Sequence, residues 1–176
     1  MDVDLVPCVE HRHYTSYPAY KDGTYDSGMA FQPRFSSETI VNYPGLHYEN
    51  GCDMHSNYKE TVRIFKNARD YYNENFDTVW TIGAHSYGIE CLIYNVPEAI
   101  LKRSNRADRF DETLQFLEDA EESDDLEGFD QVSEMEELFG SSNTQWEVSE
   151  AEYMISRLRG MWDDWYDKQK NAQLFN

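Results

Sequence analysis

The sequence lacks the features of a membrane-bound or exported protein. No run of 18 apolar residues occurs, and the first residues lack the basic stretch and long apolar segment of a signal peptide. These absences predict a cytoplasmic protein with no membrane partner. Cysteine is also scarce, since Cys8, Cys52 and Cys91 form an odd, widely spaced set without a CxxC pair. Such a set favours reduced thiols over a disulfide framework or a zinc site.

Basic residues are also scarce relative to acidic residues. The chain has 15 Lys and Arg against 34 Asp and Glu, which gives a formal net charge of -19. Residues 111–137 carry 13 of the acidic side chains and contain no Lys or Arg. Because a surface this acidic repels phosphate backbones, binding to duplex nucleic acid is disfavoured. A small nucleotide chelated to a divalent cation is still compatible with this charge.

What is present predicts a folded core. The 176 residues are 40% hydrophobic and 15% aromatic, which is enough for one domain of ordinary size or two small ones. This composition argues against wholesale disorder, although the net charge alone would favour it. The acidic surplus and the core must therefore come from different segments.

The first fifty or so residues have the pattern of an antiparallel sheet fragment. Proline and glycine punctuate short β-like runs, as is typical of strands joined by turns. We expect strands at residues 3–13, 28–32, 39–42 and 46–49, with a turn at 43–45.

From residue 56 the hydrophobic period becomes helical. A helix over residues 58–72 gathers its apolar side chains on one face and Lys59, Arg63 and Lys66 on the opposite face. The last helix is predicted to begin with a capping box made by Ser149 and Glu152. Further helices are expected at residues 87–95, from residue 110 with acidic side chains on its solvent face, and at 149–168.

Two nearby aspartates suggest a cation site. Asp2 and Asp4 lie two residues apart on a predicted strand, so their carboxylates project from the same face. Such a pair can hold Mg²⁺, which takes one or two carboxylates and completes its shell with water and substrate phosphates. The alternative is a pair of exposed acids at a strand end. His11 and His13 also share a strand face, but surface histidines are favoured there over metal ligands.

The basic stripe on the predicted helix over residues 58–72 has two possible roles. Lys59, Arg63 and Lys66 could cradle a triphosphate, because three cations on one face supply donors for several phosphate oxygens. The alternative is a solvated face supported by ion pairs with Glu60 and Asp70.

Residues 81–88 imitate the nucleophile elbow of a serine hydrolase, with Ser86 at the turn. The chain order disfavours that activity, because such a hydrolase needs its histidine downstream of the serine and every histidine here lies upstream. A better role for Ser86 and Tyr87 is at a helix N-terminus, where a hydroxyl meets an anion and a ring stacks on a base. The alternative is that Ser86 is an N-cap and Tyr87 a packing residue.

Five segments form a pattern that is more specific than any one of them. They are DLVPCVEHRHY at residues 4–14, IVNYPGLH at 40–47, YKETVRIFKN at 58–67, HSYGIECLIYNVP at 85–97 and LFGSSNTQW at 138–146. In this order they resemble segments of the bacterial cyclic-oligonucleotide synthases of the CD-NTase family, nucleotidyltransferases related to cyclic GMP-AMP synthase and oligoadenylate synthase. The resemblance spans nearly the whole chain.

The resemblance implies an α+β fold in two parts. Residues 1–54 would form part of a polymerase-beta-like palm of antiparallel strands, and residues 55–176 an α-helical C-terminal domain that contains the acidic segment 111–137. The implied activity is the Mg²⁺-dependent joining of ATP or GTP into signalling oligonucleotides, often cyclic, that trigger anti-phage effectors.

The same resemblance assigns roles to single residues. Asp4 matches the third metal-binding aspartate of the family. Lys66 matches the helix lysine that contacts the donor triphosphate, with Arg63 beside it. Ser86 and Tyr87 match the serine and the stacking tyrosine of the nucleotide pocket.

One departure from the family pattern is large. The family places a Gly-Ser turn and two aspartates upstream of the Asp4 strand, whereas here nothing precedes Met1, and Asp2 matches no family ligand. Because two-metal chemistry needs several carboxylates, we expect this chain alone to be inactive. A truncated palm would also expose a sheet edge to a missing N-terminal half or to another chain.

The sequence therefore supports two hypotheses. The first is the C-terminal part of a nucleotidyltransferase that makes cyclic oligonucleotides and keeps a partial nucleotide pocket. The second is a non-catalytic protein, either a nucleotide-binding regulator or an acidic interaction protein whose 111–137 segment occupies a basic partner.

Overall fold

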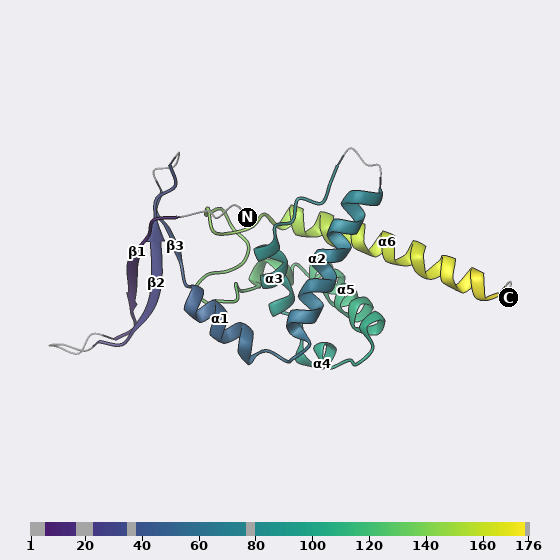
Figure 1. The fold of residues 1–176 in the computed structure, drawn as a ribbon, viewed down its shortest axis with the longest axis horizontal. Coiled ribbons are helices and arrows are strands. Elements are labelled where there is room, and N and C mark those ends of the chain that lie inside the picture. The colour runs from purple at the N-terminus through teal and green to yellow at the C-terminus, as the bar shows by residue number, and fades with distance from the viewer. Residues whose placement is uncertain (1–5, 17–22, 35–37, 77–79, 175–176) are drawn as a thin grey trace.

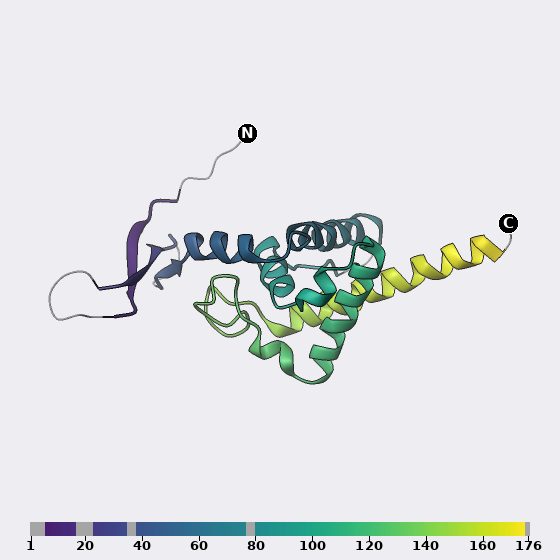
Figure 2. The ribbon, with the colours of Figure 1, turned by 90° about the horizontal axis from the view of Figure 1, so that it is seen from below.

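A small sheet and a helical body make up the protein in the computed structural model (Figure 1). The structure describes residues 6–16, 23–34, 38–76 and 80–174, and it describes side chains of the last helix as far as Asp167. The sheet lies at one end of the molecule and the C-terminal helix projects from the other end (Figures 1 and 2). No helix of the described part has both the length and the apolar character that a membrane crossing requires.

The sheet is an antiparallel meander in the order β1-β2-β3. Its strands are β1 (Val9–Tyr14), β2 (Tyr25–Phe31) and β3 (Ile40–Asn42). Tyr14 lies opposite Tyr25 in the ladder, and the two rings pack with centroids 5.4 Å apart, which is a cross-strand pair of the stabilising kind. Most strand residues are exposed, and in β2 the buried positions are Gly28 and Ala30. The sheet is therefore thinly covered in this chain.

The sheet leads directly into a helix that the sequence pattern did not predict. Helix α1 (Pro44–Asp53) begins with proline at its first turn, where the fixed φ of proline suits a helix and its missing N–H costs no bond. The prediction of a turn at 43–45 and a strand at 46–49 is therefore wrong. Leu46 and Tyr48 alternate with polar residues and imitate a strand, but they lie on different sides of a helix, Leu46 partly buried and Tyr48 exposed, and the buried residue of this helix is Gly51.

The helical body is built around α3 (Ser86–Tyr94), whose residues Ile89, Cys91, Leu92 and Ile93 are fully buried. Such an apolar helix needs neighbours on its buried sides, and α2 packs directly against it. The other elements of the helical body are α2 (Tyr58–Asn75), α4 (Glu98–Leu101), α5 (Arg106–Glu122), η1 (Asp125–Gly128) and α6 (Val148–Leu174). Together they bury one continuous core.

The two longest predicted helices are confirmed. Helix α2 buries Tyr58, Val62, Phe65 and Tyr72, as its 3.6-residue period predicts. Helix α6 begins at Val148, so Ser149 lies inside its first turn and is not the N-cap that the capping-box pattern predicts.

The buried and charged faces of the last two helices also agree with the sequence. Helix α6 buries Ala151, Met154, Ile155 and Leu158 in the core. The acidic face of α5 meets a single cation of α6, since Arg159 contacts Asp111 at 2.6 Å and Glu118 at 2.9 Å.

The end of the acidic segment is a loop that folds back on itself. Residues 129–147 contain two isolated β-bridges, Asp130 with Glu137 and Phe139 with Trp146. Leu138, Phe139 and Trp146 are buried and anchor this loop to the helical body. The loop is thus brought to the junction between the helical body and the sheet, where it forms one wall of a pocket.

Candidate functional site

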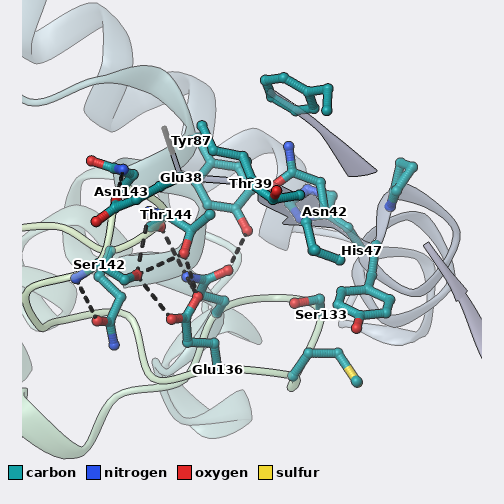
Figure 3. A pocket seen from close by; sticks show the side chains of 18 of the residues that line it. Glu38, Thr39, Asn42, His47, Tyr87, Ser133, Glu136, Ser142, Asn143 and Thr144 are labelled. Atoms are coloured by element: carbon teal, nitrogen blue, oxygen red, sulfur yellow. Dashed lines mark hydrogen bonds between the residues drawn. The ribbon is translucent and has the colours of Figure 1, made fainter. Parts of the chain in front are cut away.

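A pocket of about 1020 Å³ lies between the sheet and the helical body (Figure 3). Its walls are β3, the start of α1, the first turn of α3 and the loop of residues 131–145. Elements that are far apart in the sequence therefore meet there. Among the described lining residues no lysine or arginine is found, and the carboxylates are Glu38 and Glu136.

Tyr87 is the aromatic residue that α3 presents to the pocket. It is 38% exposed, and its ring stacks on the His47 imidazole with centroids 5.4 Å apart and planes at 25°. Its hydroxyl donates a hydrogen bond of 2.8 Å to Gln131 Oε1. Partial burial raises the pKa of this phenol, so the hydroxyl keeps its proton at neutral pH.

One carboxylate connects three helices next to Tyr87. Glu90 of α3 contacts His47 Nε2 of α1 at 3.3 Å and Lys66 Nζ of α2 at 3.4 Å. The hydrogen bond from His47 and the charge of Lys66 hold the pKa of Glu90 below its ordinary value. The Glu90 carboxylate is therefore ionised at neutral pH. The cation of Lys66 is linked through Glu90 and His47 to the ring of Tyr87.

The first turn of α3 is capped by a histidine. His85 is the N-cap, and its Nδ1 accepts the N–H of Gly88 at 2.9 Å. Burial lowers the pKa of His85, which favours the neutral imidazole that this bond needs. Ser86 is exposed and is the first helical residue, so the alternative that Ser86 serves as the N-cap is wrong. Its hydroxyl is left at the surface beside Tyr87.

The basic stripe of α2 divides in the folded protein. Lys66 points to Glu90, whereas Lys59 lies 3.4 Å from Cys52 Sγ and over the Tyr48 ring of α1. Arg63 is exposed between them. A continuous cradle of all three cations at the pocket is therefore not formed by these side chains, and Lys66 is the member that reaches α3.

The predicted ion-pair support of this stripe is wrong as well. Glu60 pairs with Arg106 at 2.5 Å and with the buried Arg109. Asp70 pairs with its neighbour Arg69 at 2.8 Å. Both acids serve other parts of the helical body, so neither of them neutralises the cation of Lys66.

Polar side chains of the loop form a connected network in the pocket wall (Figure 3). Glu136 accepts hydrogen bonds from Ser142 Oγ at 2.9 Å and from Thr144 Oγ1 at 2.5 Å. Gln131 Nε2 donates to the carbonyl of Thr144 at 3.0 Å and lies 3.3 Å from Glu136 Oε2. The acidic segment is thus partly a wall of the pocket and not a solvated loop throughout.

The structure leaves the metal prediction untested. Asp4 and Asp2 lie outside the described residues. Within the described ranges, no three His, Cys, Asp or Glu side chains come together as a group that could hold a metal ion. On the strand of His11, the neighbouring His13 lies 3.6 Å from Asp26. The three cysteines are free, Cys8 and Cys52 at the surface and Cys91 in the core.

Comparison with known proteins identifies the family. Residues 50–163 match the model of the cGAS/DncV-like nucleotidyltransferase C-terminal helical domain, and the chain belongs to this family. The chain is 33% identical over 169 residues to the cyclic nucleotide synthase CdnE01 of Staphylococcus haemolyticus, covering 93% of this chain and 55% of that protein. It is also 33% identical over 169 residues to a cyclic UMP-AMP synthase of Rhodothermus marinus, covering 94% of this chain and 56% of that protein.

The solved structures agree with the sequence matches. The structure of the Rhodothermus marinus CdnE c-UMP-AMP synthase with Apcpp and Upnpp superposes with a TM-score of 0.78 at 33% identity, over 90% of this chain and 53% of that one. The chain thus spans about half the length of the relatives it matches. The resemblance stated from the five segments is confirmed. So is the α+β fold of a partial palm followed by a helical domain, whereas the boundary at residue 54 stays a prediction.

Three residues in or next to the pocket were not predicted from the sequence: His47 and Gln131 line it, and Glu90 contacts His47. His47 and Glu90 lie inside two of the five segments, but nothing in their spacing indicates that they meet, because 43 residues separate them. Gln131 lies in the acidic segment and carries no local signal of burial. A buried polar residue of this kind can be recognised as part of a site only when the tertiary structure shows its hydrogen-bond partners.

Proposed function

We propose that this chain is the C-terminal part of a nucleotidyltransferase that joins ATP or GTP into cyclic oligonucleotides for anti-phage signalling in the cytoplasm. Membership of the family supports this proposal. So does the likeness to a synthase whose structure was solved with the nucleotide analogues Apcpp and Upnpp. In this role the chain supplies one wall of the nucleotide pocket.

The proposed nucleotide contacts centre on α3. Tyr87 would stack on the base, Lys66 would contact the triphosphate with Arg63 nearby, and the exposed hydroxyl of Ser86 would meet a phosphate at the helix N-terminus. One observation carries the assignment: Glu90 joins the Lys66 cation to the His47 ring that stacks on Tyr87. The Lys66 cation is therefore linked, through Glu90 and His47, to the aromatic ring that lines the pocket.

Turnover by this chain alone is not part of the proposal. Two-metal nucleotidyl transfer needs several carboxylates that fix the ions about the attacking and leaving oxygens. Among the described residues no such group exists, and Asp4 is the one metal ligand that we assign. When bound, Mg²⁺ would neutralise the triphosphate and activate the ribose hydroxyl. The described residues by themselves do not fit that ion, so we propose nucleotide binding without product formation.

Binding measurements test the pocket assignment. Titration calorimetry with ATP is expected to show that Lys66→Ala weakens binding by about tenfold or more, because a charge-assisted hydrogen bond is lost. Lys59→Ala is the matched control, since Lys59 is on the same helix but contacts α1. ATP affinity that is insensitive to Lys66, or equally sensitive to Lys59, would remove the assignment.

A second measurement tests turnover. Radiolabelled ATP and GTP are incubated with the purified chain and Mg²⁺, and the products are separated by chromatography. We expect no linear or cyclic oligonucleotide. Product formed by this chain alone would refute the claim of inactivity while supporting the family activity.

A further inference from the structure

Gln131 is a buried polar side chain of the pocket wall, with 5% of its surface exposed, the same fraction as its neighbour in the wall, Ser133. Both groups that face its amide nitrogen are acceptors, the carbonyl of Thr144 and the carboxylate of Glu136. The amide oxygen must therefore face Tyr87, and the Tyr87 hydroxyl must be the donor of the 2.8 Å bond between them. A buried amide with every partner satisfied has one stable orientation, because turning it would break buried hydrogen bonds.

The frame that holds Gln131 is itself fixed by hydrogen bonds. The backbone N–H of Gln131 donates to the carbonyl of Glu136 at 3.0 Å, and the Gln131 carbonyl accepts the N–H of Glu134 at 2.9 Å. Ser142 and Thr144 close the network on the Glu136 carboxylate (Figure 3). The loop therefore presents Gln131 Oε1 to α3 from a well-defined position.

Tyr87 is thus contacted by groups from two distant parts of the chain. The His47 ring stacks on its ring, and Gln131 binds its hydroxyl. From these contacts we infer that Gln131 is a positioning residue, which fixes the Tyr87 ring as the platform for a nucleobase. The inference rests on the proposed function, since it assigns Gln131 a role in the same site. Gln131 acts through Tyr87 and contributes to binding of the base, whereas the triphosphate is bound elsewhere.

The test separates the base from the triphosphate. Affinities for ATP and for inorganic tripolyphosphate are measured by calorimetry with the wild-type chain, Gln131→Met, Tyr87→Phe and the double variant. Either single substitution breaks the same neutral hydrogen bond, and we expect each to weaken ATP binding by about three- to tenfold. Tripolyphosphate binding is expected to be unchanged. The double variant should bind ATP like the single ones, because the Tyr87–Gln131 bond is the interaction with the nucleotide platform that both changes remove.

Several results would overturn the inference. Additive losses in the double variant, or a loss of tripolyphosphate binding equal to the loss of ATP binding, would show that Gln131 does not act through Tyr87. Thermal unfolding of each variant shows whether the fold survives. If Gln131→Met does not fold, Tyr87→Phe is sufficient, because unchanged ATP affinity in that variant also refutes the role.

Failure of the proposed function gives a different pattern. If the wild-type chain does not bind ATP, or binds it equally well after Tyr87→Ala, the nucleotide pocket and the positioning role both fall. If ATP affinity depends on Tyr87 but not on Gln131, the nucleotide pocket stands and the positioning role alone is wrong.

Discussion

The sheet and the helical body differ in how much of their structure this chain completes. In the sheet most side chains are exposed, and large apolar residues such as Val9 and Met29 face solvent. In the helical body the α3 residues Ile89, Cys91, Leu92 and Ile93 are fully buried. The helical body therefore carries the stability, because buried apolar area is the main favourable term in folding.

The pocket lies where these two regions meet, and both regions supply residues to its lining. The helical body provides Tyr87 to the pocket lining, and Glu90 and Lys66, which lie outside the lining, are linked to Tyr87 through His47. The sheet side provides β3 and the start of α1, which carries His47. A site shared in this way depends on the junction, so a change in the thinly covered sheet can alter the pocket without unfolding the core.

The largest expected effect on stability comes from a substitution in the buried helical body, and it is compared with a substitution in the exposed sheet. Leu92→Ala removes a fully buried side chain of α3 and is expected to lower the free energy of unfolding by about 2–5 kcal/mol. Met29→Ala, at a side chain that is 47% exposed in β2, is expected to change it by about 0.5 kcal/mol or less. Urea unfolding followed by circular dichroism measures both. Equal losses would contradict the view that the helical body carries the stability.

A smaller effect is expected where a glycine allows close packing beside the site. A Cβ on Gly88 would lie 2.9 Å from Trp146 Cε3, and the Trp146 ring is held by its 2.6 Å hydrogen bond to Glu150. Gly88→Ala is therefore expected to destabilise the protein by about 1–3 kcal/mol, although alanine is the better helix former. The measurement is the same urea unfolding.

A second helical glycine provides the control. Gly160 of α6 has open space where its Cβ would be, so Gly160→Ala is expected to stabilise the protein by about 0.5–1 kcal/mol. The two substitutions should thus have opposite signs. Stabilisation by both would mean that Trp146 can move away from α3 at little cost.

Helix α2 was predictable from the period of its apolar residues. Helix α1 was not, because its sequence pattern fits a strand as well as a helix. Residues 58–72 repeat at 3.6 residues and became α2, because a wide apolar stripe can be buried only in that conformation. Residues 46–49 alternate apolar and polar side chains, and the proline at the helix start decided for α1. The choice between a strand and a helix at this position depended on Pro44, and proline is also common in turns.

The site shows a similar division. Tyr87 and Lys66 were indicated by segments that resemble a family, and the structure links them through Glu90 and His47. Their roles in binding stay predictions. The partner Gln131 could not be predicted, because it lies 44 residues from Tyr87 and is surrounded by acidic residues that indicate solvent. Long-range pairs of this kind follow from the tertiary fold and not from a local period.

A pH-dependent effect is expected at the carboxylate that joins the two regions. The groups that face Glu90 are His47 of α1 and Lys66 of α2, and they lower its pKa from the ordinary value of 4.5. A carboxylate whose folded-state pKa is lowered contributes stability above the unfolded value and loses it as the pH falls through the folded value. We therefore expect the melting temperature to fall less between pH 6 and pH 3 in Glu90→Gln than in the wild type. The corresponding difference in the free energy of unfolding is on the order of 1 kcal/mol.

Glu98→Gln is the matched control for this pH effect. Glu98 is exposed and forms an i,i+4 pair with Lys102, a surface contact that contributes little to stability. Its variant should follow the wild-type curve of melting temperature against pH. If Glu90→Gln also follows that curve, the junction of α1, α2 and α3 is not held by this carboxylate. The sheet side would then be joined to the helical body by packing alone, and the affinity of the pocket for ATP should not depend on the charge of Glu90.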